Sequence, residues 1–219
     1  MSAVSAGPAP KSIERRFDSL LILDIDEVVL HFITPFQALL AEHGAQLHAE
    51  SFRLTGNVRS IATGTALSGH VLDRVTAQLY EEQEKRQTPV EGVGESLGRL
   101  SAVADIVFLT AMTPAYYDHR RRLLDRSGLS YPMIATERSK GGVVAELSEG
   151  RAGPVVFVDD LPPNLHGVRK SAGHVELVHL MANDIFRAHL PPLPTGAHSA
   201  TDWVDGERLL TRLLGAESL

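Results

Sequence analysis

The stretch LLILDID (residues 20–26) places two carboxylates directly after a short, fully apolar run, and this arrangement decides the fold. A second stretch, VVFVDD (residues 155–160), has the same design. Branched apolar runs without alternation are typical of strands that are buried on both faces of a parallel sheet. In such sheets the ligand site lies beyond the carboxyl ends of the strands, so the four acids are expected to converge there. These acids are Asp24, Asp26, Asp159 and Asp160.

A cluster of four carboxylates needs a cation to keep its members ionised together. Carboxylate oxygens favour hard cations, and Mg²⁺ typically takes one or two of them and leaves its other positions to water and substrate phosphate. The sequence therefore predicts a Mg²⁺ site at this edge of the sheet.

Composition narrows the class of protein. The 219 residues, 43% of them hydrophobic and 22% charged, suffice for one domain or for a domain with a substantial insertion. A net charge of -6 argues against nucleic acid as a partner, because a phosphate backbone requires a basic surface. The chain has no cysteine, which excludes thiolate chemistry and fits a reducing cytoplasm. No apolar stretch approaches the ~18 residues of a membrane span, so no membrane partner is expected.

Strand-like and helix-like segments alternate from Glu91 onward. The sequence predicts strands over 105–109, 131–135, 155–158 and 175–180, with helices between them. Thr113 and Ser139 are predicted helix N-caps, and Gly128 is predicted to end a helix. This order indicates an α/β fold with a doubly wound, mainly parallel, Rossmann-like sheet.

Residues 31–88 interrupt this alternation. Two helical patterns, over 35–43 and 71–85, flank a Gly- and Thr-rich piece. An insertion after the first acidic strand end is expected to form a mainly helical cap that covers the site as a lid, although a packing extension remains an alternative. The core domain would then comprise residues 12–30 and 89–219. Residues 1–11 are predicted to be a disordered lead, and the tail shows no chemical signature.

Four segments together resemble the motifs of the haloacid dehalogenase (HAD) superfamily. In chain order they are LLILDIDEVV, VFLTAMTPA, Lys140 at a helix start, and VVFVDDLPPN. The resemblance extends from Leu20 to about Asn164, and the insertion resembles a C1-type cap. The motifs point to the superfamily and to its chemistry, and they leave the subfamily open.

The resemblance implies a role for each motif residue. Asp24 is the expected nucleophile, and Asp26 is the expected general acid and then base. Thr110, together with the amide of Ala111, would bind a phosphoryl oxygen near a helix N-terminus. Lys140 would act as a fixed positive charge beside Asp24 and would also contact the substrate phosphate.

The resemblance also implies the metal ligands. Asp24, the backbone carbonyl of Asp26, and the pair Asp159 and Asp160 would form the Mg²⁺ site, and the sequence leaves open which of the pair binds directly. Glu27 departs from the small residue that many relatives carry there. It could lie at the cap hinge or face solvent.

The predicted function is Mg²⁺-dependent hydrolysis of a small phosphorylated metabolite through an aspartyl-phosphate. Hydrolytic dehalogenation is disfavoured, because dehalogenases of this superfamily lack the metal and the second aspartate of the first motif. A phosphomutase of the same superfamily remains open. So does a non-catalytic relative that binds a ligand or partner, although none of the catalytic acids is missing. The sequence does not determine the substrate or the oligomeric state.

Overall fold

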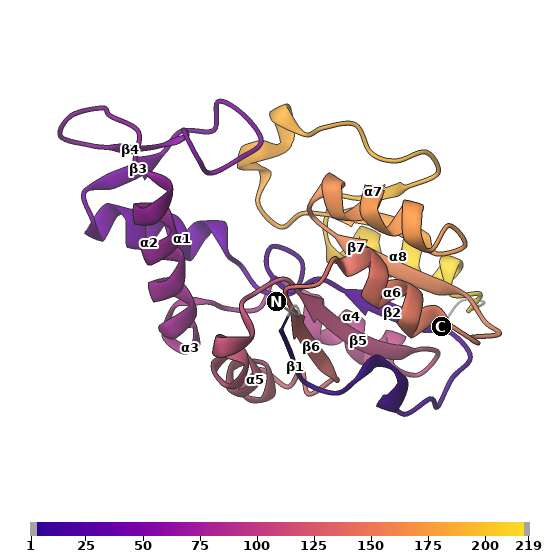
Figure 1. Cartoon of the computed structure of the whole chain (residues 1–219). Coiled ribbons are helices and arrows are strands. Elements are labelled where there is room, and N and C mark those ends of the chain that lie inside the picture. Colours follow the sequence, from indigo (N-terminus) through magenta and orange to yellow (C-terminus); the bar gives the residue numbers. More distant parts are fainter. Residues whose placement is uncertain (1–3, 217–219) are drawn as a thin grey trace.

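A central sheet of seven strands forms the core of the computed structural model, which describes residues 4–216 (Figure 1). The strand order is β1-β6-β5-β2-β7-β8-β9. All neighbouring strands of this sheet run parallel, except that β1 pairs antiparallel with β6. The prediction of a doubly wound, mainly parallel sheet is confirmed.

The strands and helices of the core follow the predicted alternation. The strands are β1 Ser5–Ala6, β2 Leu20–Leu23, β5 Asp105–Thr110, β6 Met133–Thr136, β7 Val155–Asp159, β8 Glu176–Leu180 and β9 His198–Ala200. The helices are α4 Val93–Leu100, α5 Tyr117–Arg126, α6 Lys140–Ser148, α7 Pro162–Ser171 and α8 Trp203–Leu213, and short 3-10 helices span Pro10–Ser12, Pro114–Tyr116 and Asp184–His189.

Helices cover both faces of the sheet, and alternate residues of β2 show this. Leu21 and Leu23 belong to a buried cluster that includes side chains of α4, α5 and α8. Leu20 and Ile22 belong to a second cluster, which includes side chains of α6 and α7. A fully apolar strand is therefore required at this position, because neither of its faces meets solvent.

The insertion contains α1 Ile33–Glu42, β3 Ala45–Leu47, β4 Val58–Ser60, α2 Gly69–Glu81 and α3 Gln83–Arg86. It has a hydrophobic cluster of its own, built from α1, α2 and the antiparallel β3–β4 pair. Its two connections to the core lie side by side, since His31 donates to the carbonyl oxygen of Thr88 and Val90 donates to that of Val29. The elements of this mainly helical insertion lie within the range predicted for the cap.

Two local predictions were wrong. The predicted disordered lead contains β1 and a 3-10 helix, because the edge of β6 offers backbone partners and Ser5 hydrogen-bonds Thr136 through their hydroxyls. Residues 1–3 of that lead lie outside the described residues. Thr113 makes no side-chain cap, because a 3-10 turn precedes α5. Ser139 does cap α6, and Gly128 follows the end of α5 with a φ of +73°.

Candidate active site

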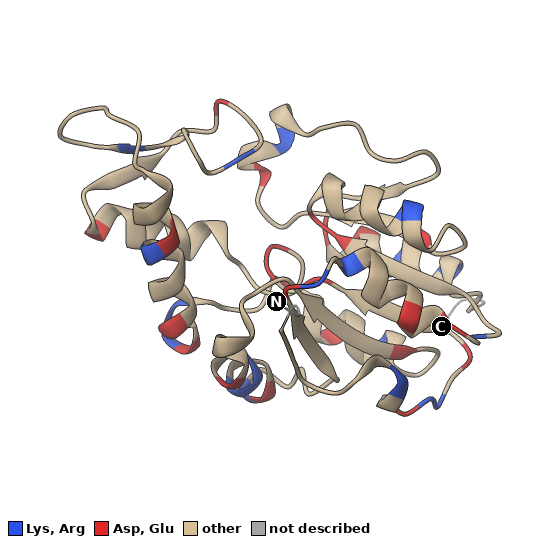
Figure 2. Ribbon diagram, in the orientation of Figure 1, with Lys and Arg blue, Asp and Glu red and all other residues tan. Residues whose placement is uncertain are grey.

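The carboxyl ends of three neighbouring strands bring the predicted site residues together. Leu23 of β2 lies opposite Phe108 of β5 on one side and Val158 of β7 on the other. Asp24, Thr110 and Asp159 follow or end these strands, and all three are buried. The acidic positions after β2 and β7 lie close together at the centre of the molecule (Figure 2).

Lys140 reaches this edge from the first turn of α6. Its Nζ lies 2.5 Å from Oδ1 of Asp24 and 2.7 Å from Oδ2 of Asp159. A Cβ on Gly141 would lie 2.5 Å from the carbonyl oxygen of Gly167, so only glycine allows α6 to pack this closely on α7. Burial would lower the pKa of Lys140, but the charges of Asp159 and Asp24 outweigh burial and raise it. Lys140 is therefore a permanent cation of the site.

Asp24, Asp159 and Asp160 form a cluster that could hold a metal ion. Each offers a carboxylate oxygen, and these oxygens all lie within 4.8 Å of one another. Burial, reinforced by the charge of Asp159, raises the pKa of Asp24 to about 7 even though Lys140 opposes the shift. Burial and the charges of the other two acids also raise the pKa of Asp160. One lysine thus leaves this all-oxygen cluster short of positive charge, and a hard divalent cation fits it.

The two acids after β7 have different environments. Asp159 accepts hydrogen bonds from the Leu161 amide and, through both oxygens, from the Asn164 side chain, in addition to Lys140. Asp160 faces a cavity above the sheet edge, whereas Asp159 does not line it. Asp159 is thus occupied by protein donors, and Asp160 is the more available of the two for a ligand.

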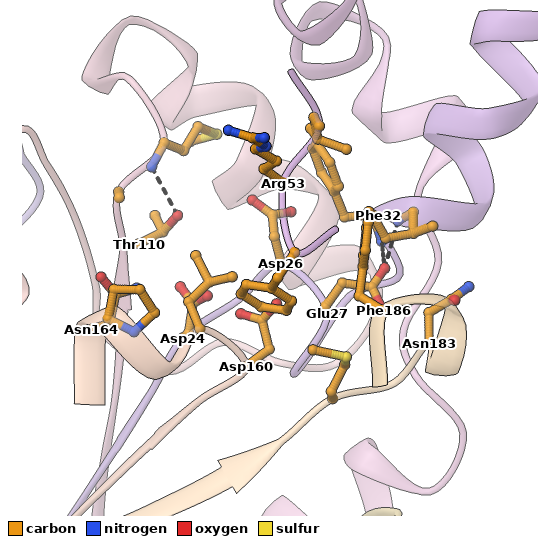
Figure 3. Close-up of a pocket in the computed structure, with 18 of the residues that line it drawn as sticks. Asp24, Asp26, Glu27, Phe32, Arg53, Thr110, Asp160, Asn164, Asn183 and Phe186 are labelled. Carbon is orange, nitrogen blue, oxygen red and sulfur yellow. Dashed lines mark hydrogen bonds between the residues drawn. The ribbon is translucent and has the colours of Figure 1, made fainter. Parts of the chain in front are cut away.

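The segment after β5 presents a hydroxyl to the cavity. Oγ1 of Thr110 accepts a hydrogen bond from the Met112 amide at 3.0 Å, which leaves its proton free to donate (Figure 3). Thr110 and Ala111 both line the cavity. The arrangement can bind an anionic oxygen beside Asp24.

Asp26 lines the same cavity, but its side chain lies outside the three-carboxylate cluster. Its Oδ1 accepts from Nε2 of Gln87 at 2.9 Å and lies 3.0 Å from Nη2 of Arg120. The hydroxyl of Tyr80 donates to its Oδ2 at 3.4 Å. The insertion and the core together therefore fix this carboxylate. The predicted metal contact of Asp26, through its backbone carbonyl, stays a prediction.

Arg120 is a fully buried cation on α5 that the sequence analysis missed. Its Nε donates to Gln83, its Nη2 donates to Gln87 at 3.1 Å, and its guanidinium lies over the Tyr80 ring. All three of these partners belong to the insertion or to its second connection. Arg120 thus joins the insertion to the carboxylate of Asp26.

The cavity has a volume of about 470 Å³. Besides the predicted site residues, its wall contains mostly apolar side chains from both the insertion and the core. They include Phe32, Ile33, Phe52, Leu54 and Tyr80 on one side and Met112, Leu161, Met181 and Phe186 on the other. A ligand bound at Asp24 would be enclosed by both parts of the chain (Figure 3).

Comparisons with known proteins agree with this geometry. No protein-family model matches the sequence, and no curated protein matches it. Similar solved structures do exist. A haloacid dehalogenase-like protein of unknown function from Agrobacterium tumefaciens has a TM-score of 0.59 and 19% identity, over 90% of this chain and 98% of that one. The chain has the haloacid dehalogenase-like fold.

Two further similar structures have this fold. A HAD family hydrolase from Deinococcus radiodurans, solved with bound phosphate and sodium, has a TM-score of 0.59 and 14% identity over 91% of this chain and 97% of that one. A putative beta-phosphoglucomutase from Thermotoga maritima has a TM-score of 0.56 and 16% identity over 90% of this chain and all of that one. At these identities the likeness concerns the HAD-like fold alone.

Glu27 lies next to the start of the insertion. It is buried with a φ of 62°, and its Oε1 accepts from the amides of Phe32 and Ile33 at 2.7 and 2.5 Å. Burial raises the pKa of Glu27, although these amides oppose the shift. A non-glycine residue in the left-handed conformation is strained, and the two hydrogen bonds from these amides compensate for the strain. Glu27 therefore does not face solvent but lies where the insertion leaves the core, and its role at a cap hinge stays a prediction.

Other residues at the site were not predicted from the sequence. Asn164, to which the sequence assigned no role at the site, donates to both oxygens of Asp159. Asn164 follows Asp159 by five residues and lies on the first turn of α7, and this spacing is the sequence feature that could have indicated the contact. Met181 and Phe186 lie between β8 and β9, where the sequence indicated no site residue, and both line the cavity. No helix among residues 4–216 has both the length and the apolar character needed to cross a membrane.

Proposed function

We propose that the chain is a Mg²⁺-dependent phosphomonoester hydrolase that acts on a small phosphorylated metabolite through an aspartyl-phosphate. One observation supports this most directly. Asp24, paired with Lys140 at 2.5 Å, borders a cavity that also contains the hydroxyl of Thr110 and the carboxylate of Asp26. A nucleophile, an anion-binding group and a second acid around one space are the parts that phosphoryl transfer to a carboxylate requires.

In the first step, Asp24 attacks the phosphorus, and the bond between phosphorus and the ester oxygen breaks. Thr110 and the amide of Ala111 bind phosphoryl oxygens, and Lys140 offsets the negative charge beside Asp24. Asp26 gives its proton to the departing ester oxygen. In the second step, Asp26 takes a proton from water, which attacks the aspartyl-phosphate and releases inorganic phosphate. The balance is ester plus water to alcohol plus phosphate.

The residues proposed to hold Mg²⁺ are Asp24, Asp160 and the carbonyl of Asp26, with Asp159 contributing through water. Asp160 is assigned the direct contact because Lys140 and Asn164 already occupy the oxygens of Asp159. When bound, the ion would neutralise phosphoryl oxygens and offset the mutual repulsion of the carboxylates.

The insertion is proposed to act as a C1-type cap over residues 31–88, and to cover the substrate as a lid. Its side chains line the cavity on the side opposite the sheet edge, and its two connections are held together at the hinge. A lid of this kind excludes water other than the attacking molecule and contacts the part of the substrate that the core does not reach.

A panel of phosphate esters, assayed with Mg²⁺ and with chelator, tests the proposal. Phosphate release that requires the divalent ion is expected, and mass measurement should locate a phosphoryl group on Asp24. Halide release that is unaffected by chelator would identify a dehalogenase instead. Isomerised phosphate esters without free phosphate would identify a mutase. Absence of turnover with every ester would favour a binding protein and would overturn the proposal.

A further inference from the structure

The two ends of the cavity differ in chemistry. Charged and polar groups gather at the sheet edge, where the phosphoryl group is proposed to bind. Away from this edge, the wall is dominated by aromatic and aliphatic side chains. Figure 3 shows Phe32 and Phe186 together on one side of the view, with Thr110 and Asn164 on the other. The part of the substrate that leaves as an alcohol would therefore lie among apolar groups.

Aromatic rings from separate parts of the chain form this apolar end. Phe52 of the insertion meets Phe186 of the core edge-on, with their ring centroids 5.9 Å apart. On the insertion side, the ring centroids of Phe32 and Tyr80 lie 6.1 Å apart. These four rings line one cavity in a chain that has only twelve aromatic residues, since Phe, Tyr and Trp number 7, 4 and 1. Ring edges and faces of this kind favour a flat, apolar partner.

The polar groups at this end are few, and several of them are engaged within the protein. Oε1 of Glu27 is held by two backbone amides, whereas its buried Oε2 has no hydrogen-bond partner within residues 4–216. The side chain of Asn183 accepts from the Ile185 amide and donates to the Thr34 hydroxyl. Arg53 also lines the cavity; it is exposed on the loop of the insertion, and its Nε donates to the Ser51 hydroxyl. Oε2 of Glu27 and the Arg53 guanidinium are the polar groups still available among these residues. A polyhydroxylated leaving group would therefore bury most of its hydroxyls without partners, which is unfavourable.

We propose that the site selects phosphomonoesters of apolar alcohols, with an aromatic ring as the best fit, over esters of polyhydroxylated alcohols such as sugars. The rings of Phe32, Phe52, Tyr80 and Phe186 bind the apolar body of the leaving group. This inference rests on the proposed phosphomonoesterase function and names the substrate class of the same site.

A matched pair of esters tests this selection. 2-Phenylethyl phosphate and ribose 5-phosphate are both esters of primary alcohols, so the chemical step makes similar demands in each. With Mg²⁺ present, kcat/KM for the phenylethyl ester is expected to be about tenfold higher or more, because the site loses affinity when buried polar groups lack partners. Equal values, or a preference for the sugar phosphate, would overturn the inference and leave the phosphatase function intact.

Variants assign the selection to the rings. Phe186→Ala and Phe52→Ala should each lower kcat/KM for the phenylethyl ester by roughly tenfold, while ribose 5-phosphate changes by less than about threefold. Ile61→Ala is the matched control, because Ile61 is an apolar residue of the insertion that is exposed and does not line the cavity. Parallel losses with both esters would point to general damage of the site and would contradict the assignment.

Binding separates this inference from the proposed catalysis. 2-Phenylethylphosphonate, which cannot be hydrolysed, should bind the Mg²⁺-loaded protein at least about tenfold more tightly than methylphosphonate, and Phe186→Ala should reduce the difference. If no ester is hydrolysed but this preference is observed, the proposed hydrolysis is wrong and the apolar subsite stands. If esters are hydrolysed and the two phosphonates bind equally, the subsite is wrong and the hydrolysis stands.

Discussion

The sheet edge and the insertion side of the cavity are built in different ways. At the sheet edge, backbone register alone places Asp24, Thr110 and Asp159 next to one another, because β2, β5 and β7 are hydrogen-bonded neighbours. On the insertion side, Phe32, Phe52 and Tyr80 come from segments with no common strand, and side-chain packing places them. One half of the site is therefore fixed by the sheet, and the other half can vary without disturbing it.

This contrast separates positioning of the reacting groups from contact with the rest of the substrate. Groups at the ends of neighbouring strands are held within a few tenths of an ångström by the ladder between them, as a reaction centre requires. Groups on an inserted element can change with the substrate, because the core does not depend on them. Asp26 belongs to both halves, since it follows β2 and its carboxylate is held by Gln87, Tyr80 and Arg120.

The largest effect is expected at the sheet edge. Asp24→Asn should reduce turnover by roughly 10⁴-fold or more, because an amide is a far poorer nucleophile and also withdraws charge from the metal site. Steady-state phosphate release with an activated aryl phosphate measures this loss. Asp18→Asn, at an exposed position far from the cavity wall, is the control and should keep near-normal rates. Near-normal turnover in Asp24→Asn would rule out the proposed nucleophile.

The next effect concerns the residue shared by the two halves. Asp26→Asn should slow esters with alkyl leaving groups by roughly 100-fold, because the departing oxygen lacks its proton donor. An aryl phosphate needs less protonation, so its first step should proceed and the aspartyl-phosphate should accumulate without a base for water. Rapid quench followed by mass measurement should then show a phosphoryl group on Asp24. Label on another residue would contradict this division of labour.

The sheet edge could be predicted from sequence because its signals are local. An apolar run followed by acids specifies a buried strand and the position of its end. Parallel pairing of such strands then brings their ends together. The apolar end of the cavity offered no such signal. Phe186 lies between β8 and β9, in a segment whose course depends on packing against the core. The residues next to it in the sequence do not indicate a cavity.

Arg120 lies between these extremes. It is the first of three consecutive arginines, and two of the three remain at least partly exposed. Yet Leu123 and Leu124, which follow it by three and four residues, are buried on the same helix, so their spacing placed Arg120 on the inner face. What the spacing could not show was its partner. The carboxylate of Asp26 is 94 residues away in sequence, and only the tertiary fold brings the two together.

A third, smaller effect would sharpen the role of that contact. Arg120→Met should slow alkyl esters by about tenfold, because Asp26 loses a partner that fixes its carboxylate, while aryl phosphates should slow less. Arg120→Lys keeps the charge and should recover part of the loss. The ratio of kcat values for alkyl and aryl esters measures the effect, and a purely structural role would leave that ratio unchanged.

Arg122→Met provides the control on the same helix. Arg122 is exposed and pairs with Glu84 of α3, so it also joins α5 to the insertion, and Figure 2 shows charged positions on both helices. An exposed pair of this kind contributes little, so the alkyl-to-aryl ratio and the rates should change by less than about twofold. Equal effects in Arg120→Met and Arg122→Met would show that cohesion between insertion and core, and not the position of Asp26, is what Arg120 supplies.

The smallest expected effect concerns stability and tests the three-carboxylate cluster. The folded-state pKa of Asp24 is about 7, raised from 3.8 mainly by burial. Between these two pKa values the folded protein keeps a proton on Asp24 that the unfolded chain releases. The free energy of unfolding therefore falls as pH rises from the unfolded pKa to the folded pKa. Bound Mg²⁺ would take the place of the proton. The increase in Tm caused by Mg²⁺ should therefore be a few degrees larger at pH 8 than at pH 5.

Thermal unfolding with Mg²⁺ or with chelator at both pH values measures this increase, and Asp24→Asn should reduce the difference between the two pH values. An increment that is independent of pH would mean that Mg²⁺ does not compete with protons at these acids, and the metal site would have to lie elsewhere.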